Sequence, residues 1–215
     1  MENTQTENII SSLDWRYATK SFDATKKLNN QQLDLLLTAI QLSPSSYGLQ
    51  PYQIIVVSNQ EIKEQLKAAA YGQSQLADAS HVFVFARTKN FSSEHVDEYA
   101  DNIVKTRGTS IESIKGFVDV MKGTVDSRSQ EELANWNARQ AYISLGILLQ
   151  TASLTAIDAC PMEGFDNSKF DEILGLDEKN LTAVVIAPVG FRSEDDLYQH
   201  FQKVRKSKED LFIHI

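Results

Sequence analysis

The segment Cys160–Phe165 (CPMEGF) places a carboxylate between a methionine and a glycine, in an apolar neighbourhood that follows a long apolar run. Pro161 fixes its own φ angle and lacks an N–H, whereas Gly164 lets another molecule approach the backbone closely. The amides of Glu163 and Gly164 could therefore point outward at a flat ligand, with the Glu163 carboxylate beside them. On these six residues alone, an ordinary turn with a solvated glutamate is the alternative.

Basic residues near both ends of the chain are the second group with binding chemistry. Arg16 and Lys20 are four residues apart and would share one face of a helical turn, and Lys203 and Arg205 stand in a basic tail. The whole chain is acidic, with a formal charge of -8. This charge argues against nucleic acid or an anionic membrane as a partner. For each basic cluster taken alone, solvated surface side chains are the alternative.

Several common catalytic and metal-binding motifs are absent from the sequence. It has no G-x-G-x-x-G turn, Walker A loop or G-x-S-x-G elbow. The four histidines have no partner four residues away, and the single cysteine, Cys160, allows neither a thiolate metal site nor an internal disulfide. There is no apolar run of about 18 residues, and the start lacks the regions of a signal peptide. We expect a cytoplasmic protein without a metal.

Capping patterns and apolar periodicity predict the helices that position these groups. The capping pairs are Asn29 with Gln32, Ser58 with Glu61, and Ser129 with Glu132. The predicted helices cover residues 9–15, 29–42, 58–70 and 129–153, and a short helix ends at Gly175. The helix over 129–153 is the longest and is apolar on nearly all sides in its second half, which indicates burial in a core or against a second subunit.

Apolar, β-branched segments predict buried strands. They lie at residues 52–58, 82–86 and 181–190, and residues 211–215 could form a final strand. Residues 92–124 are polar but helical in pattern, broken in two near Gly108, which is typical of an exposed excursion or lid. The alternation of strands and helices is too irregular for a doubly wound sheet, so we predict an α+β fold and a single domain over residues 1–215.

Five segments of this chain, in this order, resemble segments of the FMN-dependent nitroreductase family, the oxygen-insensitive NAD(P)H nitroreductases and related flavin reductases. Each segment is weak evidence by itself, but together they cover nearly the whole chain. They are Arg16–Lys20 (RYATK), Ser43–Ser46 (SPSS) with Gln50-Pro51, Asp78–His81 (DASH) before a strand, Cys160–Phe165 (CPMEGF), and Lys203–Arg205 (KVR).

The resemblance implies a nitroreductase-like α+β homodimer with a central, mainly antiparallel sheet flanked by helices. Its two FMN sites would lie at the subunit interface, and its C-terminal segment would be exchanged with the partner subunit. The residues agree with this, because an acidic protein can hold the FMN phosphate only with local cations. Arg16, Lys203 and Arg205 match the phosphate-binding positions. Lys20 matches a lysine at the pyrimidine edge, where a cation stabilises charge that develops on reduction.

The resemblance also assigns roles to other positions. Glu163 is the implied catalytic residue, whose carboxylate helps to place the substrate or a water, and its amide and that of Gly164 would contact N5 and O4 of the flavin. Gln140 matches a buried glutamine beside Glu163. The remaining implied cofactor-binding residues are Tyr17, Ala18, Pro44, Ser45 and Ser46 (the last three from the second subunit), Gln73, Gln75, Pro161 and Met162. Tyr47 and Phe117 are candidates for the substrate mouth.

Three positions depart from the family pattern. Gln73 stands where family members often carry an asparagine. Ala18 stands where a ribityl-binding serine is common, and neutral Gln75 stands where some members carry a lysine, which affects the flavin potential more than flavin binding. The implied reaction is a ping-pong hydride transfer from NAD(P)H to a nitroaromatic, quinone or flavin acceptor. The alternatives are a dihydropteridine reductase or reductive dehalogenase on the same fold, a non-catalytic flavin-binding sensor or carrier, and a helical interaction module without flavin.

Overall fold

A four-stranded antiparallel sheet lies at the centre of the computed structural model, which describes residues 2–215, with side chains from residue 4 onward. The strand order is β1-β2-β4-β3, and each neighbouring pair runs antiparallel. The strands are β1 (Tyr52–Val57), β2 (His81–Thr88), β3 (Asp158–Ala159) and β4 (Leu181–Gly190). The antiparallel sheet with helices around it confirms the predicted α+β class.

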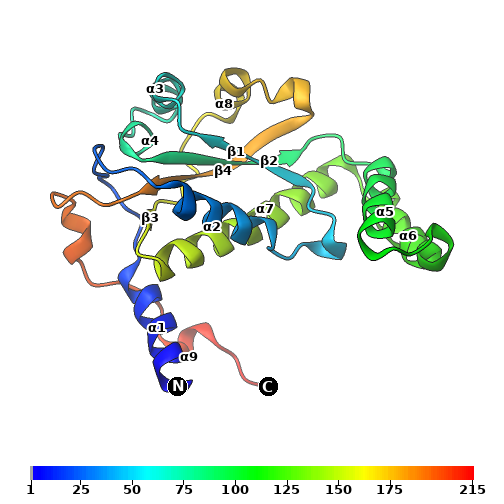
Figure 1. Cartoon of the computed structure of the whole chain (residues 1–215), viewed down its shortest axis with the longest axis horizontal. Coiled ribbons are helices and arrows are strands. Elements are labelled where there is room, and N and C mark those ends of the chain that lie inside the picture. Colours follow the sequence, from blue (N-terminus) through cyan, green and yellow to red (C-terminus); the bar gives the residue numbers. More distant parts are fainter. Residues whose placement is uncertain (1) are drawn as a thin grey trace.

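The sheet is covered by helices on both faces because its strands are apolar on both sides (Figure 1). Along β2, Val82 and Val84 face one hydrophobic core, whereas Phe83 and Phe85 face the other, as the two-residue period of a strand requires. The first core is closed by α3 (Gln60–Ala69), α4 (Gln75–Asp78) and α8 (Asn167–Leu174), and the second by α2 (Asn30–Gln41) and α7 (Gln130–Leu154).

Two helices, α5 (Ser93–Arg107) and α6 (Ile111–Asp126), extend from one end of the sheet (Figure 1). They enclose a third, smaller core with the beginning of α7, in which Val96, Met121 and Leu133 are buried. Gly108 ends α5 with φ 62°, a left-handed angle that glycine adopts without strain. The predicted helical excursion and the break near Gly108 are confirmed.

The opposite end of the molecule carries both chain termini. Helix α1 (Glu2–Trp15) packs on α7, and the C-terminal tail follows η3 (Leu197–His200) back to α1 (Figure 1). The predicted final strand at 211–215 is wrong for this chain: Ser207 caps a short helix, α9 (Lys208–Leu211). The exposed residues after it pair with no strand in the described part of the chain. Two further 3-10 turns are η1 (Ser46–Gly48) and η2 (Asp177–Lys179).

The helix caps show how far local sequence fixes these elements. The capping boxes at Asn29 and Ser129 are confirmed. The cap predicted at Ser58 is wrong by one residue, because the side chain of Asn59 accepts the hydrogen bond from the amide of Ile62 at 3.0 Å. Asparagine and serine are equally good N-cap residues. Which of Ser58 and Asn59 caps the helix therefore depends only on where β1 ends. Among the described residues, the helices are too short or too polar to cross a membrane.

Candidate functional site

A cavity of about 820 Å³ opens beside the end of α1, where the N-terminal segment and the tail meet. We call it the cation cavity. Six of the residues singled out in the sequence line it together: Arg16, Tyr17, Ala18, Lys20, Lys203 and Arg205. Arg192 also lines it, and Asp14 is the one acidic residue among the described lining residues. Cations from both ends of an acidic chain therefore converge on one space.

The cations of this cavity act on one another. Burial lowers the pKa of Arg16, and the charge of Arg205 lowers it further. The pKa of Lys203 is also lowered, first by burial and then by Arg16 and Arg205. Repulsion of this kind costs free energy in the free protein, and a bound anion relieves it. The cavity is therefore suited to an anionic group.

The tail is tied to α1 by a lysine. Lys203 Nζ donates to the backbone carbonyl of Leu13 at 3.1 Å and to that of Arg16. These carbonyls belong to the last turn of the helix and the residue after it, where the helix dipole favours a positive charge. The contact joins segments 190 residues apart in sequence and places Lys203 next to Arg16.

Two acidic residues that the sequence did not reveal as important fix the segments that line the cation cavity. The Asp196 carboxylate is 2% exposed and accepts hydrogen bonds from the hydroxyl of Tyr17 and the amides of Lys20 and Ser21. Burial alone would raise the pKa of Asp196, but these hydrogen bonds outweigh it and the pKa is lowered. The sequence signals only an acidic turn at 193–196, without showing which carboxylate is buried.

The second is Asp158 in β3, which pairs with Arg192. Arg192 Nε lies 2.8 Å and Nη2 2.7 Å from Asp158 Oδ1, and the Arg192 amide donates to Oδ2 at 2.9 Å. The guanidinium carbon lies 4.0 Å from the centroid of the Trp15 ring and 4.6 Å from that of Tyr17. This stack fixes the two aromatic residues that flank Arg16.

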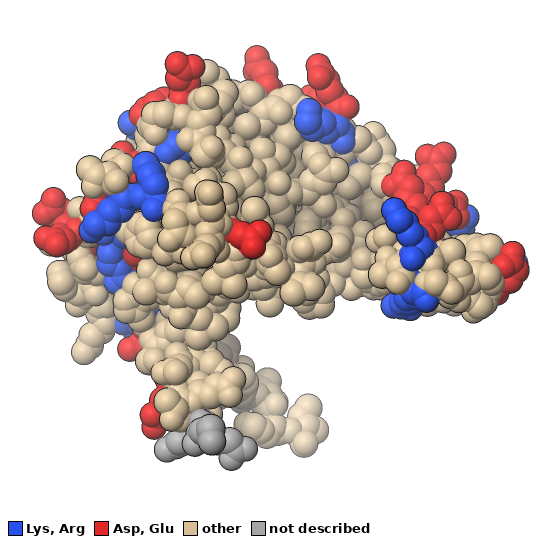
Figure 2. Space-filling model, viewed as in Figure 1, with Lys and Arg blue, Asp and Glu red and all other residues tan. Residues whose placement is uncertain are grey.

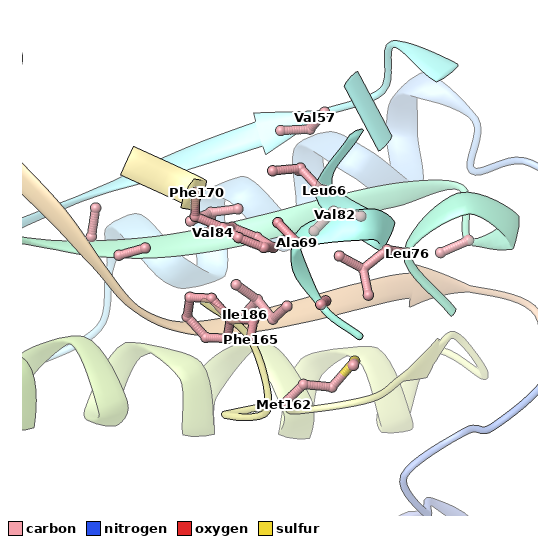
Figure 3. Packing of buried hydrophobic residues seen from close by; sticks show 14 of the residues in the cluster. Val57, Leu66, Ala69, Leu76, Val82, Val84, Met162, Phe165, Phe170 and Ile186 are labelled. Atoms are coloured by element: carbon pink, nitrogen blue, oxygen red, sulfur yellow. The ribbon is translucent and has the colours of Figure 1, made fainter. Parts of the chain in front are cut away.

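Residues 161–164 run beside β4. We call them the 161–164 strip. The amide of Met162 donates to the carbonyl of Ile186 at 2.8 Å, and the Met162 and Phe165 side chains belong to the first hydrophobic core (Figure 3). Glu163 and Gly164 are exposed, and neither amide has a hydrogen-bond partner within residues 2–215. The two free amides agree with the expectation from Pro161 and Gly164.

Side chains from two other elements hold this strip in place. Tyr142 on α7 donates a hydrogen bond to Glu163 Oε1 at 2.6 Å, and burial together with this bond raises the pKa of Tyr142 to about 12. Gln73 Nε2 donates to the Gly164 carbonyl at 2.7 Å. Gln75 is buried at the first position of α4, two residues further on. The Tyr142 contact has no sequence signal, because it joins two separate elements.

The cation cavity and the 161–164 strip adjoin each other. Ala18 bridges to Ala159, and the charges of Lys20 and Arg16 reach the thiol of Cys160 between them. Cys160 is 1% exposed, and burial raises its pKa against the influence of these cations. It is therefore a small, buried core side chain. The strip therefore begins beside the residues that line the cavity.

The loop at residues 44–47 lies away from the cation cavity and the 161–164 strip. The Ser46 amide donates to Gln140 Oε1 at 2.8 Å, and the Tyr47 hydroxyl lies 3.1 Å from Thr124 Oγ1 in α6. The Tyr47 and Phe117 rings meet edge to face with centroids 6.0 Å apart, so the two proposed mouth residues do lie together. Pro44 and Ser45 precede them, and Ser45 Oγ accepts from the Gln50 amide. Gln140 is bonded to Ser46 and Trp136 rather than to Glu163.

Helix α7 separates the 44–47 loop from the strip. Gln140 is hydrogen-bonded to the loop, and Tyr142 is hydrogen-bonded to Glu163. Side chains two residues apart point about 200° apart around a helix, so the loop and Glu163 lie on opposite faces of α7. The cation cavity and the α5–α6 pair also lie at opposite ends of the molecule (Figure 1). One chain therefore does not bring all of the predicted site residues to a single pocket.

The fold and this arrangement of groups define a nitroreductase-type α+β protein. A crystal structure of a provisionally named nitroreductase from Bacillus subtilis matches with a TM-score of 0.86 at 21% identity, covering 98% of this chain and 100% of that one. A provisionally named nitroreductase from Exiguobacterium sibiricum, solved in complex with FMN, matches with a TM-score of 0.82 at 18% identity, covering 96% and 97%.

Sequence comparison narrows this class to one family. The model of the nitroreductase family matches residues 13–191. A protein of Staphylococcus epidermidis provisionally named an NAD(P)H nitroreductase is 35% identical over 218 residues, which cover 97% of each chain. The chain belongs to the nitroreductase family.

Proposed function

We propose that this protein is an FMN-dependent NAD(P)H oxidoreductase that reduces nitroaromatics, quinones or flavins by two-electron transfer. The observation that carries the proposal is the cation cavity, which lies beside a strip with two free backbone amides. FMN needs both features, because one end of it is a phosphate and the other a flat ring system. Family membership supports the same cofactor and the same donor.

The cavity fits the phosphate of FMN. A phosphate monoester carries a charge of about −1.5 to −2 at neutral pH. Arg16, Lys203 and Arg205 would pair with it, and binding would relieve the repulsion among them. Arg192 is already neutralised by Asp158, so it would support the site without binding the phosphate. Ala18 lines the cavity without a hydroxyl, so it offers no side-chain hydrogen bond to the ribityl chain.

The 161–164 strip would lie along the ring system. Bound FMN supplies the hydride-accepting and hydride-donating centre of the reaction. The amides of Glu163 and Gly164 would orient the ring edge, and Lys20 would stabilise negative charge at the pyrimidine edge. Glu163, held by Tyr142, would place the substrate or a water. In a ping-pong cycle, the oxidised nicotinamide leaves before the acceptor enters the same open space.

A homodimer would complete the site. The 44–47 loop and Phe117 lie away from the cation cavity of their own chain, so a partner subunit would supply them. The face carrying α2 has few charged side chains, most of which lie around the rim of this view (Figure 2). Leu35, Leu37 and Leu42 are exposed in and just after α2, and the tail ends in exposed apolar residues. We propose that these surfaces meet the partner and that the tail reaches across to it.

The test is an absorption spectrum of the purified full-length protein, followed by NADH and NADPH oxidation with a quinone or a nitrobenzoate. We expect a yellow protein with about one FMN per chain, and parallel lines in double-reciprocal plots, as ping-pong kinetics requires. A colourless protein that binds no added FMN would contradict the proposal. A yellow protein that oxidises neither nucleotide would indicate a flavin-binding sensor or carrier instead.

A further inference from the structure

The Asp196 carboxylate makes a set of hydrogen bonds that the proposed reaction does not itself require. Its Oδ2 accepts from the Tyr17 hydroxyl at 2.9 Å, the Lys20 amide at 2.7 Å and the Ser21 amide at 3.0 Å. Its Oδ1 accepts from the Tyr198 amide at 3.0 Å, at the start of η3. Three of these four donors belong to the N-terminal segment, so this carboxylate, in a residue that is 2% exposed, links the two segments that line the cation cavity.

We propose that Asp196 is a positioning residue that fixes the spacing of the cations in the cation cavity and so sets its affinity for a phosphate group. This inference rests on the proposed FMN function. Asp196 does not bind the phosphate, because like charges repel. It acts through Tyr17, which is next to Arg16, and through the turn at Tyr198 that leads to Lys203 and Arg205.

The backbone around Asp196 shows why this carboxylate is needed. Residues 21–23 pair with 191–193 through main-chain bonds, from Asp23 N to Phe191 O at 2.8 Å and from Ser193 N to Ser21 O at 2.9 Å. This pairing stops at Ser21, just before the residues that line the cavity. Beyond it, Asp196 joins Lys20 and Tyr17 to the turn that leads into the tail. The Lys20 ammonium then lies 6.0 Å from the centroid of the Tyr198 ring, on the same turn.

The charge of Asp196 and its hydrogen bonds predict opposite effects on FMN affinity when the carboxylate is removed, which allows a clear test. By charge alone, a carboxylate near the cavity opposes an anion, so its removal would tighten FMN binding. By geometry, removal frees Tyr17 from the turn that leads to the tail and widens the range of distances between Arg16 and the tail cations, so FMN binding would weaken. Asp195 is the matched control, because it is adjacent and exposed, and its carboxylate makes no hydrogen bond in the part of the chain that the structure describes.

The experiment compares the wild type, Asp196→Asn and Asp195→Asn as full-length chains freed of flavin and titrated with FMN and with riboflavin, which lacks the phosphate. We expect Asp196→Asn to raise the FMN Kd by about tenfold or more, the scale of a lost charged hydrogen-bond network. The riboflavin Kd should change by less than about threefold, because the cations pair with the phosphate. Asp195→Asn should leave FMN binding unchanged or tighter.

Two results would overturn the inference: equal FMN Kd values for the two variants, or an equal weakening of FMN and riboflavin, which marks a general loss of structure.

If Asp196→Asn does not fold, Tyr17→Phe removes one of the four bonds and keeps the ring that stacks on Arg192. It should raise the ratio of the FMN Kd to the riboflavin Kd by about two- to fivefold, and an unchanged ratio would overturn the inference. A wild type that binds no FMN would overturn the proposed function instead.

Discussion

At the scale of single residues, Glu163 combines two separable features. Its backbone amide is free, whereas its carboxylate is held by the Tyr142 hydroxyl at 2.6 Å. A substitution of the side chain removes the charge but leaves the amides of Glu163 and Gly164 in place. Cofactor binding and catalysis can therefore be tested independently at this position.

We predict that Glu163→Gln keeps FMN but slows reduction of the flavin by NAD(P)H by about a hundredfold, the scale of a lost substrate-positioning contact. The glutamine can still accept the Tyr142 hydrogen bond, so the strip should keep its conformation. Stopped-flow absorbance of the bound flavin measures this rate. Glu172→Gln, on the exposed side of α8, serves as the control and should match the wild type. An unchanged rate in Glu163→Gln would reject a catalytic role for the carboxylate.

At the scale of secondary-structure elements, α3 holds the segment before β2 through a buried lysine. Lys63 is 1% exposed, and its Nζ donates to the carbonyls of Ala77 at 3.0 Å and Ala79 at 2.7 Å. Burial, followed by the charge of Lys27, lowers the pKa of Lys63 to about 8. The same segment leads from Gln75 toward the sheet, so Lys63 supports the loop that carries Gln73 and Gln75.

This lowered pKa predicts a pH-dependent stability. Between about pH 8 and the ordinary lysine pKa of about 10.4, the unfolded chain binds more protons at this position than the folded chain does, so stability rises with pH. From pH 8 to about pH 9.5, Lys63 should add about 1.5 kcal/mol to the free energy of unfolding. Urea titrations of the wild type and Lys63→Met measure this as a difference that grows with pH. A difference that stays constant would contradict the lowered pKa.

At the scale of the whole molecule, the predicted site residues fall into two separate halves. The cation cavity and the 161–164 strip form one half, and the 44–47 loop with Phe117 forms the other, across α7 (Figure 1). Each complete site would combine one half from each subunit. Two variants that are damaged in different halves should then restore activity to each other in a mixed dimer. A mixed dimer would then contain one site with two intact halves.

We predict such complementation between Lys203→Ala/Arg205→Ala, which damages the cavity, and Ser45→Trp, which fills the space in front of the loop. Each variant alone should be inactive. Coexpressed chains should recover about a quarter of the wild-type activity, because half of the dimers are mixed and half of their sites are intact. NAD(P)H oxidation with a quinone measures the recovery. Its absence, with mixed dimers present, would place both halves of each site in one chain.

The sequence by itself determined the features that depend on neighbouring residues. The capping boxes at Asn29 and Ser129, the break at Gly108 and the exposed amides at 163–164 follow from side chains and φ angles within a few positions. It also indicated, through a resemblance, that cations from both ends of the chain belong together. The position of the α3 cap was missed by one residue, because two adjacent residues were equally suitable.

Only the tertiary structure decided which groups hold those cations. Among three consecutive acidic residues, it buries Asp196 and bonds it to Tyr17, 179 positions away, and it pairs Arg192 with Asp158. It also places the 44–47 loop and Glu163 on opposite faces of α7 and leaves the tail without a strand partner. These features depend on contacts between distant segments, whose energies local sequence patterns do not contain.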